Sequence, residues 1–262
     1  MRPPAVAGTF YPADADGLRR ALDVAFDDAR PACVDGRPKA VIAPHAGYVY
    51  SGPVAATAYA LLRPLRESVE RVVLLGPSHR VPVEGVAVCS ADLLATPLGT
   101  VRVDAAGREA VIGLPGVRVW DEPHAREHSL EVHLPFLSVV LGDVEVLPLA
   151  VGRAPADQVA GVLDAVWGGP ETLVVVSTDL SHYHPYEEAR ARDRATADAV
   201  EEGRHEAIGP YDACGAFPLR GLLVAAAGRR MRPRAIDLRN SGDTAGPRDQ
   251  VVGYGAFVLP AA

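Results

Sequence analysis

Two histidines each follow a short apolar run, at the point where a strand would end. His45 follows KAVIA (residues 39–43) and His79 follows RVVLLG (71–76). Continuous apolar runs of this kind are typical of strands that are covered on both faces. Parallel strands bring the residues after their carboxyl ends to one edge of the sheet, where ligands bind. The sequence therefore predicts that both imidazoles lie at one functional edge.

Three further residues belong to the same predicted pocket. Asp179 and His182 follow the apolar run TLVVVST (172–178), and Cys214 precedes a segment expected to be a buried helix. The positive end of a helix dipole lowers the pKa of a nearby thiol, and the thiolate is the form that binds metal. Two imidazoles and one anionic donor form a metal site with open positions, which suits iron, copper or zinc. Asp179 would then orient a ligand imidazole, and His182 would act as a general acid or base.

Each of these residues also has a purely structural interpretation. A single histidine in a loop is more often solvated or hydrogen-bonded than bound to metal. Asp179 alone suits a helix or turn cap, and Cys214 alone suits an ordinary buried thiol. A different chemistry uses the same residues, with Cys214 as a nucleophile and a histidine, expected to be His182, as its base.

The histidine-dense segment REHSLEVHLPFL (126–137) has two interpretations. It lacks the order of an H-E-x-x-H zinc motif. It is either an amphipathic helix with a leucine face, or it places Glu127 and His128 on the rim of the same pocket. The polar loop RNSGDTAG (239–246) is either a simple turn or part of the pocket mouth. In the second case the side chains at the mouth would be Asn240, Ser241 and Asp243.

The elements that must position these residues alternate between strands and helices. Further strands are expected at 85–90, 144–152 and 251–259, and helices at 15–29, 53–65, 155–167 and 185–203. The helix at 53–65 would carry Pro53 in its first turn. TPLGTVRVD (96–104) is typical of a hairpin or the edge of a mixed sheet. Such alternation predicts a single α/β domain over 1–262, with a mostly parallel or mixed central sheet flanked by helices.

Composition narrows the class of protein. The chain has 262 residues, 48% of them hydrophobic, and a net charge of −7. An acidic chain argues against nucleic acid as a partner, because that needs a clustered basic face. No apolar run reaches the length of a transmembrane helix, and no signal peptide is evident. Three widely spaced cysteines predict free thiols in a reducing cytoplasm.

Seven motifs identify a resemblance that runs through nearly the whole chain. In order they are AGTFYP (7–12), APHAGYVYSG (43–52), LLGPSHR (74–80), EHSLEVHLPFL (127–137), STDLSHY (177–183), ACG (213–215) and NSGD (240–243). The sequence resembles the Memo-like family, the B component of the AmmeMemoRadiSam gene neighbourhood in prokaryotes. That family is similar in fold to the class III extradiol dioxygenases, which are non-haem iron enzymes.

The resemblance implies a ligand set and partners. His45, His79 and Cys214 would bind the metal, with Fe(II) expected first and copper or zinc as alternatives, and Asp179 and His182 would complete the pocket. The dioxygenases use a glutamate where this chain has Cys214. A thiolate is a stronger donor than a carboxylate and can itself be oxidised. The resemblance therefore does not imply that this chain cleaves aromatic rings as the dioxygenases do. The candidate partners are a small molecule, a peptide, or the radical-SAM protein of the same neighbourhood. The alternative to an enzyme is a binding module that uses the dioxygenase-like fold to recognise a partner.

Overall fold

A mixed β-sheet forms the centre of the protein. The computed structural model describes residues 1–30 and 32–261. In order across the sheet the strands are β10 (Arg234–Asn240), β11 (Val251–Pro260), β1 (Pro38–Ala43), β8 (Thr172–Ser177), β2 (Arg71–Pro77), β7 (Glu145–Val151), β3 (Val86–Val88) and β6 (Val117–Val119). The expectation of one α/β fold with a central sheet and flanking helices is confirmed.

The middle of the sheet is parallel and its flanks are not. The neighbours β1, β8, β2 and β7 all run in the same direction. However, β11 is antiparallel to β1 and to β10, and β3 is antiparallel to β7. β4 (Leu93–Thr96) and β5 (Gly99–Val103) form the predicted hairpin. The short β9 (His182–His184) pairs with β11. The parallel centre positions the candidate site, because it brings the carboxyl ends of the three predicted strands β1, β8 and β2 to one edge of the sheet.

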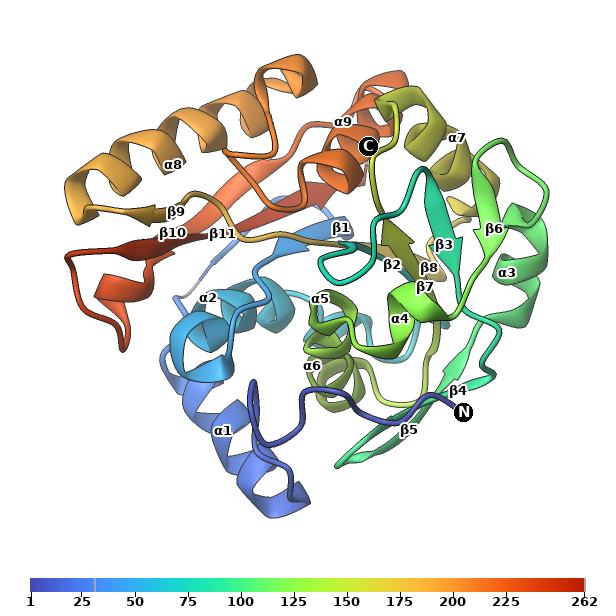
Figure 1. Ribbon diagram of the computed structural model, residues 1–262, viewed down its shortest axis with the longest axis horizontal. Helices are drawn as coiled ribbons and strands as arrows, with labels where there is room; N and C mark the ends of the chain where they lie inside the picture. The colour runs from blue at the N-terminus through green and yellow to red at the C-terminus, as the bar shows by residue number, and fades with distance from the viewer. Residues whose placement is uncertain (31, 262) are drawn as a thin grey trace.

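Helices cover both faces of the sheet. They are α1 (Ala15–Asp27), α2 (Tyr48–Ala60), α3 (Ala105–Val111), α4 (Glu122–Ala125), α5 (His128–Glu131), α6 (His133–Leu141), α7 (Ala156–Val166), α8 (Tyr186–Glu202) and α9 (Ala216–Gly228), with single 3₁₀ turns η1 (Arg63–Leu65), η2 (His205–Ala207) and η3 (Ser241–Asp243). Figure 1 shows α1, α2 and α6 on one side of the sheet and α7, α8 and α9 on the other.

Alternate residues of the central strands pack into two separate cores. In β1, Val41 packs into the core shared with α1, α2 and α6, whereas Ile42 packs into the core shared with α7 and α9. Both side chains are at most 1% exposed. This double coverage explains why the strand has no polar alternation in its sequence.

One predicted helix needs correction, and one strand was missed. The helix predicted at 53–65 begins earlier, at Tyr48, so Pro53 lies inside α2 and not in its first turn. Almost all of α2 is buried, and this packing outweighs the backbone hydrogen bond that proline cannot make. Strand β10 was not predicted, because its sequence RAIDLRN carries charged residues that suit a strand at the edge of a sheet. None of the helices in residues 1–30 and 32–261 is both long and apolar enough to cross a membrane.

Candidate metal centre

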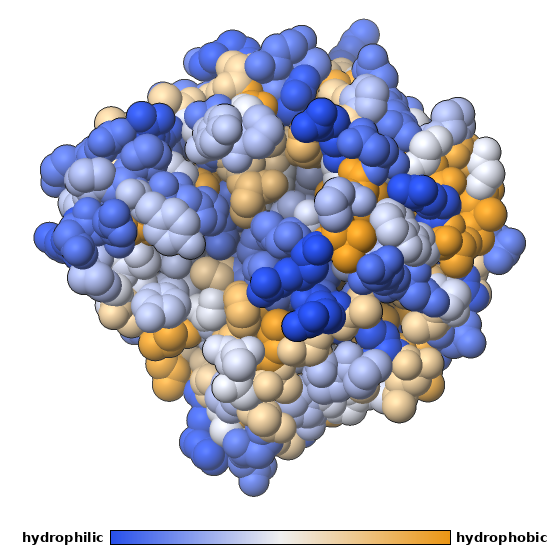
Figure 2. Space-filling model, viewed as in Figure 1, coloured by the Kyte–Doolittle hydropathy of each residue, from blue (hydrophilic) through white to orange (hydrophobic). Residues whose placement is uncertain are grey.

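The three neighbouring parallel strands β1, β2 and β8 deliver site residues to one edge of the sheet. His45 lies two residues after the end of β1, His79 two after β2, and Asp179 two after β8. These are the strand-end positions that the sequence indicates. Figure 2 shows hydrophilic side chains gathered near the middle of this face of the molecule, over the region where Figure 1 places α5 and the ends of the central strands.

A serine hydroxyl orients the His45 ring. The Ser177 hydroxyl donates to the carbonyl of Ser129 at 2.6 Å, so its oxygen can only accept from His45 Nδ1, which lies 2.6 Å away. His45 therefore carries its proton on Nδ1 and keeps a bare lone pair on Nε2. The ring is 2% exposed, and burial together with the neighbouring histidines holds its pKa well below the ordinary value. His45 is thus a neutral imidazole with Nε2 available to a ligand.

A buried carboxylate orients the His79 ring in the same way. Glu127 Oε1 accepts from His79 Nδ1 at 2.9 Å, and Glu127 Oε2 accepts from the His79 backbone N–H at 2.6 Å. Burial by itself would raise the pKa of Glu127, but the hydrogen bond and charge of His79 and the backbone N–H of Ser129 lower it to about 2. An ionised carboxylate only accepts, so His79 carries a proton on Nδ1, and Nε2 is the unprotonated nitrogen of the neutral ring.

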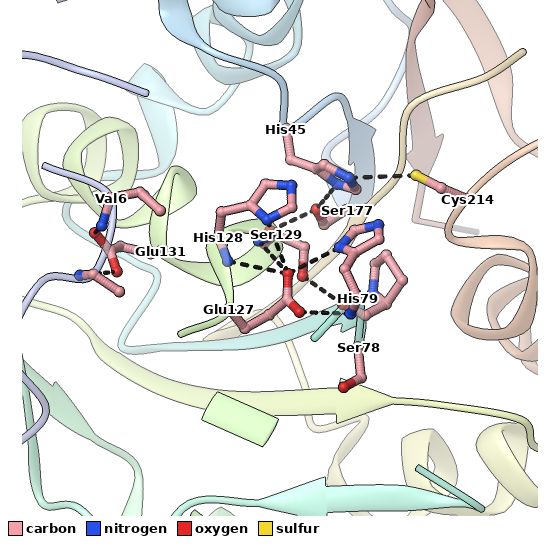
Figure 3. A network of polar contacts seen from close by, with 12 residues as sticks. Val6, His45, Ser78, His79, Glu127, His128, Ser129, Glu131, Ser177 and Cys214 are labelled. Atoms are coloured by element: carbon pink, nitrogen blue, oxygen red, sulfur yellow. Dashed lines mark hydrogen bonds and ion pairs between the residues drawn. The ribbon is translucent and has the colours of Figure 1, made fainter. Parts of the chain in front are cut away.

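His128 brings a third imidazole to the same point. One ring nitrogen from each of His45, His79 and His128 lies within 4.8 Å of the other two. The His128 ring stacks on His79 at a centroid distance of 4.7 Å and meets His45 edge-on at 5.3 Å. Figure 3 shows the three rings converging beside Glu127. Of the two interpretations of segment 126–137, this geometry favours the one that places Glu127 and His128 in the pocket.

Cys214 lies beside the three imidazoles and contacts one of them. Its Sγ is 3.3 Å from His45 Nε2 and accepts the backbone N–H of Asp179 at 3.3 Å. Within the described part of the chain, Cys214 is not a member of the group of donors that lie within 4.8 Å of one another. The expected lowering of its pKa is wrong: burial and the charge of Asp179 raise the pKa of this thiol. Desolvation of the thiolate outweighs the dipole of α9, which begins two residues later.

Asp179 and His182 each have one side-chain hydrogen bond to the backbone near the pocket. Asp179 Oδ1 accepts the backbone N–H of His45 at 2.7 Å, so it holds the loop after β1, while the ring itself is oriented by Ser177. Burial raises the pKa of Asp179 to about 6. His182 Nδ1 donates to the carbonyl of Leu180 at 2.8 Å, which leaves its Nε2 free to exchange a proton.

The polar loop 239–246 has the geometry of a capped turn. The Asn240 side chain accepts from the backbone of η3, and the Asp243 side chain accepts from the Asn240 backbone N–H at 3.0 Å. Tyr186 of α8 donates to Asp243, and the Ser241 hydroxyl accepts from the Val252 backbone. These contacts confirm a capped turn, and Asp243 of the same loop also lines the large cavity beside the imidazoles.

A large cavity lies next to the imidazoles. Its volume is about 870 Å³, and it is lined by the N-terminal segment 8–12, α1, α2 and residues 243–245 of the polar loop. Phe10 lines this cavity and also contacts the His128 ring at a centroid distance of 4.5 Å. Phe10 therefore connects the lining of this cavity with the group of three imidazoles.

Comparison with known proteins places the chain in a family. The sequence profile described as Memo-like protein matches residues 2–258. A MEMO1 family protein of Aquifex aeolicus is 36% identical over 267 residues, which cover 97% of each chain. A MEMO1 family protein of Aeropyrum pernix is 36% identical over 279 residues, which cover 98% of each chain.

A solved structure shares the fold at low sequence identity. It is the crystal structure of an uncharacterized protein from Escherichia coli K12, with a TM-score of 0.53 and 14% identity, and the match covers 86% of this chain and 100% of that chain. At that identity the likeness concerns the fold alone. The match over nearly the whole sequence and the two relatives establish that this chain belongs to the Memo-like family.

Proposed function

We propose that this Memo-like chain binds a single transition-metal ion and uses it in redox chemistry on a small molecule. His45 and His79 are two of the ligands and Cys214 is a third, with Fe(II) as the favoured metal and copper or zinc as alternatives. One observation carries the proposal: Ser177 and Glu127 accept hydrogen bonds from the Nδ1–H groups of the two histidines, so Nε2 is the unprotonated nitrogen of each neutral ring.

The chemistry of the donors fits such an ion. A metal needs neutral imidazoles, and burial lowers the pKa of His45 far enough to keep it uncharged at neutral pH. Imidazole accepts iron, copper and zinc, whereas a thiolate favours the softer ions. When bound, the metal would supply Lewis acidity and one-electron chemistry, and it would lower the pKa of the Cys214 thiol that burial raises.

The other pocket residues would serve the substrate and its protons. His182 holds its Nδ1 proton against the Leu180 carbonyl, so its Nε2 can take a proton from a substrate or return one. Asp179 holds the His45 backbone and the Cys214 thiol on either side of itself. It therefore keeps these two donors in register with each other.

Metal titration followed by an oxygen-uptake assay tests the proposal. Anaerobically purified protein is titrated with Fe(II), and oxygen uptake is then followed with a panel of small phenols. We expect one Fe(II) per chain in the wild type, loss of tight binding in His45→Gln, and no change in His184→Gln, whose imidazole pairs with Glu188. A wild type that binds no transition metal below millimolar concentration would overturn the proposal.

A second candidate, thiol nucleophile chemistry, has one observation in its favour. The 3.3 Å contact between Cys214 Sγ and His45 Nε2, with His45 aligned by Ser177, has the order of a nucleophile, a base and an orienting group. The base in this candidate would be His45, whose Nε2 contacts the thiol, in place of the expected His182. This candidate predicts fast alkylation of Cys214 in metal-free protein, lost in His45→Gln and retained in His182→Gln.

The radical-SAM protein of the same gene neighbourhood stays a predicted partner.

A further inference from the structure

We infer that His128 is a ligand of the same ion, so that the metal faces three imidazoles. This inference rests on the proposed metal centre and extends its ligand set. The resemblance assigns two histidines and Cys214, but the three donors that all lie within 4.8 Å of one another are on His45, His79 and His128.

The first argument is that one carboxylate positions both His79 and His128. Glu127 Oε1 accepts the ring Nδ1–H of His79 at 2.9 Å and the backbone N–H of His128 at 3.0 Å. Glu127 is 1% exposed and forms the N-cap of α5, of which His128 is the first residue. The same carboxylate therefore fixes the backbone of His128 and the ring of His79. Phe10 contacts the His128 ring at a centroid distance of 4.5 Å.

The second argument is that a buried nitrogen of the His128 ring has no hydrogen-bond partner among the described residues. This nitrogen is Nδ1, which lies 3.2 Å from Glu127 Oε1. That oxygen already accepts three N–H groups, from the His79 ring and from the backbones of His128 and Ser129. A buried ring nitrogen without a partner is costly. A cation on Nε2 would confine the proton to Nδ1, where the adjacent carboxylate stabilises it.

The third argument concerns the position of Cys214. Its sulfur contacts His45 Nε2, and that nitrogen has a single lone pair to offer, either to the thiol or to a metal ion. By contrast, one ring nitrogen of each of the three imidazoles lies within 4.8 Å of the other two. A site of three neutral imidazoles suits borderline divalent ions such as Co(II), Zn(II), Cu(II) and Fe(II). Cys214 would be an additional donor at its edge.

Co(II) titration of four proteins tests this inference. They are the wild type, His128→Phe, Cys214→Ser and His184→Gln, each titrated anaerobically and checked for folding by thermal unfolding. Phenylalanine keeps a ring between Phe10 and His79 but removes both nitrogens. We expect His128→Phe to weaken Co(II) binding by at least about 10-fold, and His184→Gln to bind as the wild type does. The sulfur-to-cobalt charge-transfer band, absent in Cys214→Ser, reports on the thiolate separately.

The possible outcomes separate the inference from the proposal on which it rests. A His128→Phe protein that binds Co(II) as tightly as the wild type overturns the inference and leaves a centre of His45, His79 and Cys214. A wild type that does not bind Co(II) overturns both. If His128→Phe does not fold, the NMR spectrum of the Co(II)-loaded wild type decides. Three hyperfine-shifted imidazole N–H signals support three histidine ligands, and two such signals contradict them.

Discussion

Glu127 holds His79 twice, with one carboxylate oxygen on the backbone N–H at 2.6 Å and the other on the ring Nδ1 at 2.9 Å. The first contact sets the path of the chain after β2, and the second decides which ring nitrogen is bare. A single side chain thus sets both the position and the tautomer of a predicted ligand. The same carboxylate also caps α5 through the backbone N–H groups of His128 and Ser129.

Glu127→Gln should weaken metal binding by about 10- to 100-fold, the usual effect of losing a carboxylate that orients a ligand histidine. Glutamine is nearly isosteric, but it carries no charge and brings an amide that competes as a donor. Isothermal titration with Zn(II) or Co(II) measures the change. Because the variant also alters the cap of α5, its unfolding free energy is measured alongside. Unchanged affinity in a folded variant would contradict the role assigned to Glu127.

Ser177→Ala should remove the hydrogen bond that fixes the tautomer of the His45 ring. The hydroxyl that receives the Nδ1 proton would be gone, and the proton could then move to Nε2, the nitrogen that faces Cys214. Nitrogen-15 NMR of the histidine rings distinguishes the two tautomers directly. We expect wild-type His45 to show protonated Nδ1 and the variant to show a mixture, with weaker metal binding. A wild-type His45 protonated on Nε2 would show that this orientation is wrong.

The sequence predicts the strand ends better than it predicts the sheet around them. The central strands are buried on both faces, so their apolar runs stand out, and the residues that follow them could be identified. β11 also has an apolar run, but its antiparallel direction depends on its long-range pairing with β1 and β10. No local pattern encodes that direction.

Candidate site residues stand out most clearly where they directly follow such a strand. His45, His79 and Asp179 satisfy that rule. His128 does not, because it begins the four-residue helix α5, and its approach to the pocket depends on Glu127 and on packing by Phe10. The one local signal was the density of histidines in segment 126–137. The thiol pKa of Cys214 was predicted in the wrong direction, because its burial is a tertiary property.

Outside the pocket, removing the charge of Glu131 should lower the unfolding free energy more than removing any other single charge. It is buried and accepts from Arg2, the Ala5 and Val6 backbones, and the Tyr11 hydroxyl at 2.6 Å. Breaking a buried pair leaves the other charge uncompensated, so Glu131→Gln should lower the unfolding free energy by about 3 kcal/mol. Urea denaturation of the wild type and the variant measures the difference in unfolding free energy.

The matched control for Glu131 is Asp198→Asn, since Asp198 forms an exposed pair with Arg194. Exposed pairs contribute at most about 1 kcal/mol, so the control should unfold nearly as the wild type does. Equal losses in the two variants would show that the network around Glu131 does not anchor the N-terminal segment.

Asp193 should make stability depend on pH. Burial raises its pKa from the ordinary 3.8 to about 6. The folded state therefore binds this proton more tightly than the unfolded state, so the added stability is complete below pH 3.8 and is lost as the pH rises through about 6. Asp193→Asn keeps an acceptor for the Ser181 N–H and removes the charge.

Relative to the wild type, Asp193→Asn should therefore gain stability as the pH rises from 4 to 7, by no more than about 3 kcal/mol. Urea denaturation of both proteins across that range gives the difference curve. A difference that is flat with pH, or that falls as the pH rises, would contradict the raised pKa of Asp193.

Elemental analysis of anaerobically purified protein tests the central claim most directly. The wild type is compared with the double variant His45→Gln/His79→Gln, which removes the two bare Nε2 atoms and leaves Cys214 and His128 in place. The account predicts one transition-metal ion per chain in the wild type, and a folded double variant without one. Equal metal content in the two proteins, or none in a wild type purified and reloaded with Fe(II), would contradict it.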